Sequence, residues 1–176
     1  MRKTVALLSL LAAMLVLSAC SSEADFRSLV DTRGRSDTRF ALGDQVSRFE
    51  RNLVRRGVWV TVRETAAGTL ETREYVRDGE PFAPIILVAD FLNGRAVRMT
   101  IRPAGFEYFQ LEHMAYNMTM DDARANGFTP CPRISRRYVR YFDASGNEAT
   151  ADDYVYRAWF SFNADGELLD MTLARN

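Results

Sequence analysis

The sequence predicts an α+β fold made of two similar units, each a helix followed by an antiparallel β-meander. Three observations lead to this prediction. Apolar residues recur at helical spacing at the front of each half, stretches with alternating apolar and polar residues follow, and turns containing glycine separate those stretches. We expect the first unit over residues 40–105 and the second over 106–176. A chain of 176 residues is long enough to bury a core of this size.

The first unit is expected to open with a helix that starts after Leu42-Gly43-Asp44. Its apolar face is formed by residues at positions i, i+3, i+7 and i+8, namely Val46, Phe49, Leu53 and Val54. Gly57 is a natural residue to follow the helix end. Strands are predicted over residues 58–64, 69–76, 85–92 and 95–101, with Asn93-Gly94 as a type I′ hairpin turn.

The second unit is expected to repeat this order. Residues 117–127 predict a short helix with Thr119 as N-cap, Asp121 and Asp122 in the first turn, and Gly127 at the end. Strands are predicted over residues 134–142, 154–162 and 167–173.

The closing hairpins of the two halves match residue by residue. Gly94–Ile101 aligns with Gly166–Leu173 at an offset of 72, and the same face is apolar in both. Val97, Met99 and Ile101 correspond in this alignment to Leu169, Met171 and Leu173. The match indicates an internal duplication. The alternative is a single α+β domain with six or seven strands.

The N-terminus carries a targeting signal. Met1-Arg2-Lys3 precedes the apolar stretch Val5–Leu17, which is too short to span a bilayer. Leu17-Ser18-Ala19-Cys20 resembles the bacterial lipobox. This resemblance implies that residues 1–19 are a signal peptide and that Cys20 receives a diacylglycerol and a further acyl chain such as palmitate. Three acyl chains make an effectively permanent anchor.

Residues 20–39 are expected to be a polar tether between this anchor and the folded part. Ser21 stands where an aspartate would retain the protein at the inner membrane, so the lipobox rule implies the outer membrane, facing the periplasm. The full chain has 23 basic and 23 acidic residues, and losing Arg2 and Lys3 with the signal leaves a net charge of −2. This balance excludes the basic excess typical of nucleic-acid binding.

The sequence also resembles the SmpA/OmlA family, the small lipoproteins of the outer-membrane β-barrel assembly machinery, and the related β-lactamase-inhibitor-protein-like tandem fold. Two segments carry the resemblance: Met118-Thr119-Met120-Asp121-Asp122-Ala123 and Trp159-Phe160-Ser161-Phe162-Asn163-Ala164-Asp165-Gly166-Glu167-Leu168. The resemblance implies a role in envelope assembly with an outer-membrane or periplasmic protein as partner. Gly127-Phe128-Thr129-Pro130 departs from the Leu-Gly-x-Pro segment usual in that family.

Few residues suggest catalysis or metal binding. His113 is the only histidine and has no second ligand at metal spacing, so it is expected to lie in a linker or interface. Cys131 has no disulfide partner once Cys20 is lipidated, and it is expected to be an idle thiol between two prolines. The acid pairs Asp121/Asp122 and Asp152/Asp153 are explained by a helix start and a turn. We therefore predict no enzyme activity, no cofactor and no metal.

The candidate binding surface is the face of the sheet opposite the core. Strand alternation puts arginines and both tryptophans there, and the residues expected to contact a partner are Trp59, Arg63, Arg98, Arg157 and Trp159. Tryptophan and arginine dominate the binding energy of protein interfaces. The alternative is that these side chains only pack within the protein. The sequence thus predicts a lipid-anchored partner-binding protein; an inhibitor that blocks a periplasmic enzyme and a small enzyme using Cys131 are the alternatives.

Overall fold

Strands make up most of the fold. The structure, a computed structural model, describes residues 28–32, 38–57, 60–76, 83–111 and 118–176. Strands account for 51% of the described residues and helices for 12%. The strands are β1 (Ser28–Asp31), β2 (Thr38–Ala41), β3 (Val54–Arg55), β4 (Thr61–Thr65), β5 (Gly68–Val76), β6 (Ile85–Leu92), β7 (Arg95–Ile101), β8 (Phe109–Leu111), β9 (Thr129–Pro130), β10 (Arg137–Phe142), β11 (Tyr156–Phe162) and β12 (Leu168–Arg175). The helices are α2 (Val46–Asn52), the 3-10 turn η1 (Pro103–Gly105) and α3 (Met120–Ala125).

Nine of these strands form one antiparallel sheet, in the order β3-β5-β6-β7-β12-β11-β10-β9, with β4 also paired to β5. The expected α+β fold of two units, each a helix followed by a meander, is therefore wrong. The expectation gave the helices too much weight. Within the described residues α2 has 7 residues and α3 has 6, whereas the hydrogen-bonded sheet runs through both halves without a break.

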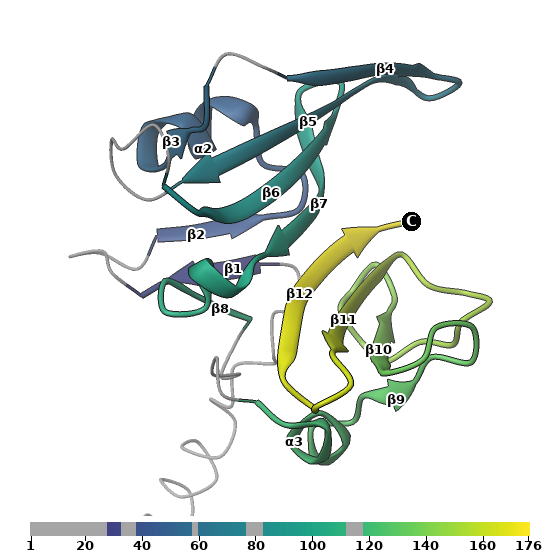
Figure 1. The fold of residues 1–176 in the computed structure, drawn as a ribbon. Helices are drawn as coiled ribbons and strands as arrows, with labels where there is room; N and C mark the ends of the chain where they lie inside the picture. Colours follow the sequence, from purple (N-terminus) through teal and green to yellow (C-terminus); the bar gives the residue numbers. More distant parts are fainter. Residues whose placement is uncertain (1–27, 33–37, 58–59, 77–82, 112–117) are drawn as a thin grey trace, which may run out of the picture.

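The two halves of the sheet meet at β7 and β12, which lie side by side at its centre (Figure 1). Thr100 is paired with Thr172, and their Oγ1 atoms are 3.0 Å apart. Around this pair the register is reciprocal, because Met99 faces Leu173 and Ile101 faces Met171. Residues 72 apart in the sequence are thus related by a local two-fold axis that passes through the threonine pair.

The same β-bulge occurs in both closing hairpins. In one, the register shifts between Asp90 and Phe91, which leaves Val97 as the extra residue; in the other it shifts between Ser161 and Phe162, which leaves Leu169. Val97 and Leu169 are equivalent in the 72-residue alignment. The sequence analysis put Leu169 on one apolar face with Met171 and Leu173, which we expected to point inward. This is wrong for Leu169 because of the bulge: Leu169 is 45% exposed, and Leu168 packs against the core instead.

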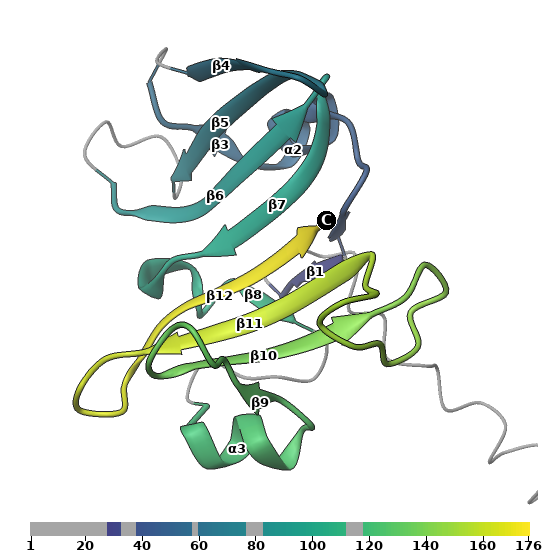
Figure 2. The same ribbon diagram turned by 90° about the vertical axis from the view of Figure 1, so that its right-hand side faces the viewer.

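A second sheet contains β2, β1 and β8 in that order. It lies on one side of the large sheet (Figures 1 and 2). Ser28–Asp31 falls inside the stretch 20–39 expected to be a tether, and this part of the expectation is wrong, since Leu29 is buried. Phe109–Leu111 pairs with β1, so the start of the expected second unit joins the N-terminal part of the chain.

The hydrophobic core lies on one face of the large sheet, under the small sheet and α2. Phe49, on the buried side of α2, stacks on Tyr75 with 5.9 Å between ring centroids and contacts Phe40 and Phe91. The helix ends at Asn52 rather than reaching Arg56, because Val54 and Arg55 pair with β5 as β3.

The helix α3 covers the other end of the core near β10 (Figure 2). The predicted N-cap Thr119 forms a capping box: its side chain accepts from the N–H of Asp122, and the Asp122 carboxylate accepts from the Thr119 N–H at 2.8 Å. Hydrogen bonds that the carboxylate accepts from the Thr119 N–H and the Thr119 hydroxyl lower the pKa of Asp122. Asp121 and Asp122 thus have the structural role expected for them.

The turn between β6 and β7 is tied to the neighbouring turn by Asn93. Its backbone has a positive φ of 50°, as the Asn-Gly turn requires. Its side chain accepts from the Thr69 N–H at 3.0 Å and donates to the Ala67 carbonyl at 3.1 Å. Gly68 leaves the space for this contact, because a Cβ there would be 2.2 Å from Asn93 Oδ1.

The core contains one hydroxyl that has no hydrogen-bond partner among the described residues, that of Tyr75. Because an unpaired buried hydroxyl lowers stability, we expect Tyr75→Phe to raise the free energy of unfolding by about 1 kcal/mol. Urea denaturation at pH 7 measures this change. A variant less stable than wild type would show that the hydroxyl has a partner.

Because Tyr75 is buried, we also expect the protein to lose stability at alkaline pH. Burial raises the pKa of Tyr75 above its ordinary value, so the folded chain keeps this proton where the unfolded chain has lost it. The contribution of Tyr75 to the free energy of unfolding is complete below pH 10. It declines by about 1.4 kcal/mol per pH unit as the pH rises from there toward the pKa of Tyr75 in the folded chain. Urea denaturation between pH 9 and pH 11 should show a steeper decline for wild type than for Tyr75→Phe.

Candidate functional site

The face of the large sheet opposite the core is polar and rich in arginine, and we call it the polar face. Alternation puts Phe160 and Met171 in the core and their neighbours Trp159 and Thr172 on the polar face. Cross-strand pairing extends this face from β4 to β10. Its main members are Thr61, Arg63, Thr72, Glu74, Val88, Asp90, Arg98, Thr100, Arg137, Val139, Tyr141, Arg157, Trp159, Ser161, Asp170 and Thr172.

Trp159 lies at the centre of the C-terminal part of the polar face. It packs with Val139 and Ala174, in a small hydrophobic cluster that also touches Cys131 and Tyr141 and is separate from the main core. Two guanidinium groups lie close to its ring, that of Arg157 at 5.0 Å and that of Arg137 at 5.3 Å from the centroid. These distances are typical of cation–π contacts. The arginines contribute to the covering of the indole, which is only 8% exposed.

The two arginines flank Trp159 along the strand. Arg157 is two residues before Trp159 on β11, and Arg137 is paired with Ser161, two residues after it. The Nε of Arg137 donates to the Ser161 hydroxyl at 3.2 Å. The guanidinium of Arg157 also lies 5.7 Å from the ring centroid of Tyr154, in the loop before β11. The guanidinium of Arg137 is therefore held by an aromatic and a hydroxyl contact, and that of Arg157 by two aromatic contacts.

The other half of the polar face is centred on a buried carboxylate. Asp90, on β6, accepts a hydrogen bond of 2.7 Å from the Thr72 hydroxyl and forms an ion pair with Arg98 at 2.5 Å. The Arg98 side chain is 51% exposed. A buried acid therefore orients an arginine whose outer surface remains available to a partner.

The residues expected to contact a partner occupy different environments. Arg63 on β4 and Arg98 on β7 are exposed, and Arg157 on β11 is half-buried. Trp159 lies on the expected face, but its ring is covered by arginines rather than displayed. Trp59 lies outside the described residues. Arg98 is separated from Arg157 by Ala174, so among the four of these residues that the structure describes, it brings together only Arg157 and Trp159.

Arg137 is the residue of this cluster that the sequence analysis missed. The predicted strand began at residue 134, whereas β10 begins at Arg137. Side chains alternate along β10: Tyr138 and Phe142 lie on the core face, whereas Arg137, Val139 and Tyr141 lie on the polar face. This alternation is visible in the sequence and could have placed Arg137 on the polar face.

The residues considered for catalysis are scattered. Cys131 is half-buried beside the Trp159 cluster, and its N–H donates to the Arg137 carbonyl at 2.7 Å. Asp152 and Asp153 are exposed in the loop before β11, and His113 lies outside the described residues. No group of three His, Cys, Asp or Glu side chains in the described part of the chain could hold a metal ion. None of the helices described is long and apolar enough to cross a membrane.

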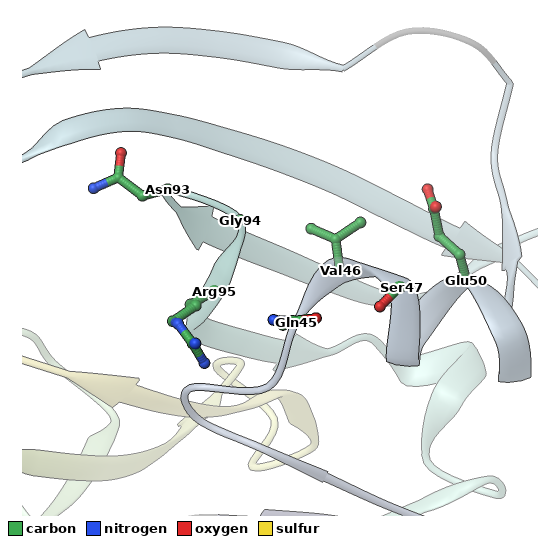
Figure 3. A pocket seen from close by; sticks show the side chains of 7 residues that line it. All are labelled: Gln45, Val46, Ser47, Glu50, Asn93, Gly94 and Arg95. Atoms are coloured by element: carbon green, nitrogen blue, oxygen red, sulfur yellow. The ribbon is translucent and has the colours of Figure 1, made fainter.

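A shallow cavity of about 490 Å³ lies between the start of α2 and the turn carrying Asn93 and Gly94 (Figure 3). Its charged groups already have partners. Glu50 forms ion pairs with Arg73 and Arg55, and Arg95 donates to the Gly43 carbonyl at 3.1 Å. The N–H of Val46 donates to the Gly94 carbonyl. We therefore regard this cavity as part of the contact between α2 and the turn, and not as a binding site.

Comparison with known proteins gives no match: no protein-family model, no curated protein and no solved structure matches this chain.

The separation of Trp159 from the main core can be tested on two adjacent residues. We expect Phe160→Ala to lower the free energy of unfolding by about 4 kcal/mol, because Phe160 is fully buried in the core. Trp159→Ala should cost only about 2 kcal/mol, since the arginine side chains over its ring can settle onto the sheet. Urea denaturation of both variants measures the difference. Equal losses would show that Trp159 belongs to the main core.

Proposed function

We propose that this chain is a lipid-anchored lipoprotein of the bacterial envelope that binds a protein partner through the polar face, without a catalytic step. The observation that carries the proposal is the composition of this face. A β-sheet whose inner face is filled by Phe160 and Met171 presents Arg98, Arg157 and the Arg-covered Trp159 on the other. Antiparallel sheets commonly leave one face to solvent, and arginine with tryptophan is the composition of protein interfaces.

The proposed anchor and location depend on the N-terminal sequence. The lipobox-like Leu17-Ser18-Ala19-Cys20 and the apolar stretch before it support lipidation of Cys20. Ser21 supports the periplasmic face of the outer membrane as the site of the anchored protein. The sequence resemblance to the SmpA/OmlA family supports a role in outer-membrane assembly.

We expect Cys20→Ser to abolish lipidation, because the acceptor thiol is lost. The wild-type chain should incorporate labelled palmitate and sediment with the outer-membrane fraction, whereas Cys20→Ser should incorporate no label and accumulate as an unprocessed precursor. Cys131→Ser is the matched control, and it should be labelled like wild type. Equal labelling of Cys20→Ser would contradict the proposed anchor.

Docking on the polar face can be tested by photo-crosslinking in cells. Val88 is half-buried on the polar face next to Thr100, so a photoreactive side chain at position 88 would lie under a docked partner. Arg51, exposed on α2 on the core side of the sheet, is the control position. We expect a discrete adduct with one protein from position 88 and none from position 51. The same adducts, or no adduct, from both positions would contradict the proposed surface.

A further inference from the structure

We propose that Arg137 and Arg157 receive carboxylate groups of an acidic segment of the partner protein. This inference rests on the proposed function, because it specifies the chemistry of a partner bound on the same polar face.

The two guanidinium groups lack an internal counter-ion. Elsewhere in the described residues, Arg73, Arg98 and Arg124 each form an ion pair with a carboxylate. Neither Arg137 nor Arg157 forms one within the described part of the chain. The Nε of Arg157 is buried and has no hydrogen-bond acceptor there. Two half-buried cations are therefore fixed in place without being neutralised.

The charges around this pair are mostly positive. Arg102 follows β7 at the same end of the sheet, and the exposed Arg133 and Arg136 lie in the segment between β9 and β10. On the polar face, Asp170 is opposite Ser161, and its Oδ1 atom has no hydrogen-bond partner among the described residues. Asp152 and Asp153 are exposed in the loop just before Tyr154. Five arginines beside these three carboxylates leave a local positive excess that complements an acidic partner.

The geometry favours discrete carboxylates over a broad anionic surface. A guanidinium group held over an aromatic ring directs its N–H groups along the ring edge, where the two terminal nitrogens match the two oxygens of a carboxylate. The terminal nitrogens are the relevant ones here, because the Nε of Arg137 donates to Ser161 and the Nε of Arg157 is buried. Binding to a membrane or to nucleic acid instead depends on many cations spread over a large area. The mature chain has a net charge of −2 and offers no such excess. An acidic protein segment is thus the occupant that fits.

The test is a titration of the full-length lipoprotein in detergent, observed by NMR through its tryptophan indole and arginine Nε–H signals. A Trp59→Phe background assigns the remaining indole to Trp159. The probe is a decaglutamate peptide, and decaglutamine is its uncharged control. We expect decaglutamate to shift the Trp159 indole and both arginine signals saturably, and less strongly as salt is added.

The variants are Arg137→Gln with Arg157→Gln, and Arg51→Gln as a matched control on α2. Glutamine keeps part of the aliphatic stem over Trp159, so the indole should stay covered. We expect the double variant to bind decaglutamate at least about tenfold more weakly, since charge-assisted hydrogen bonds are lost. Arg51→Gln should bind like wild type.

Several outcomes would overturn the inference: no shift with decaglutamate, an equal shift with decaglutamine, unchanged affinity in the double variant, or a response only to phosphatidylglycerol vesicles. Its failure is distinguishable from failure of the proposed function. An adduct from position 88 that forms equally well with Arg137→Gln and Arg157→Gln would leave the docking surface standing and refute carboxylate recognition. Decaglutamate binding without any adduct would establish the carboxylate site and refute docking of a partner on this face in cells.

Discussion

The pairing of β7 with β12 is the constraint on which the rest of the structure depends. It joins two sets of antiparallel strands into a single sheet, and it fixes their register through reciprocal contacts around Thr100 and Thr172. Because side chains alternate along a strand, this one register decides which residues on both sides face the core. Met99 and Leu173 are buried by it, and the two threonines are placed on the polar face.

The matching bulges show that the symmetry extends beyond this central pair. Val97 and Leu169 are each the extra residue of their hairpin, at equivalent positions 72 apart. A bulge increases the local twist of its strands, so equal bulges bend the two halves in the same way. The likeness is confined to the closing hairpins and does not extend to whole helix-plus-meander units.

How far the sequence predicts the structure depends on how much pattern each element carries. The long strands β5, β6, β7 and β11 have seven or more residues each and were located to within about two residues at either end. β1, β2 and β8 have only three or four residues, too few to show a period, and Ser28–Asp31 is hidden in a polar stretch. The face occupied by Arg157 and Trp159 followed from alternation. The covering of Trp159 by Arg137 did not, because it depends on the register between β10 and β11, in which Arg137 is paired with Ser161.

The same register makes the candidate site rigid. Tyr138, Phe160 and Met171 lie in the main core directly behind the cluster, and a slip of one residue in β10 or β11 would expose them. The backbone positions of Arg137 and Arg157 relative to Trp159 are therefore fixed by the hydrophobic core, and their guanidinium groups are held by contacts with aromatic rings and, for Arg137, with the Ser161 hydroxyl. A partner that binds there meets guanidinium groups that are already oriented, so little conformational entropy is lost on binding. The charges of the two guanidinium groups are not neutralised in the free protein, which lowers its stability. A carboxylate bound from the partner removes this destabilisation.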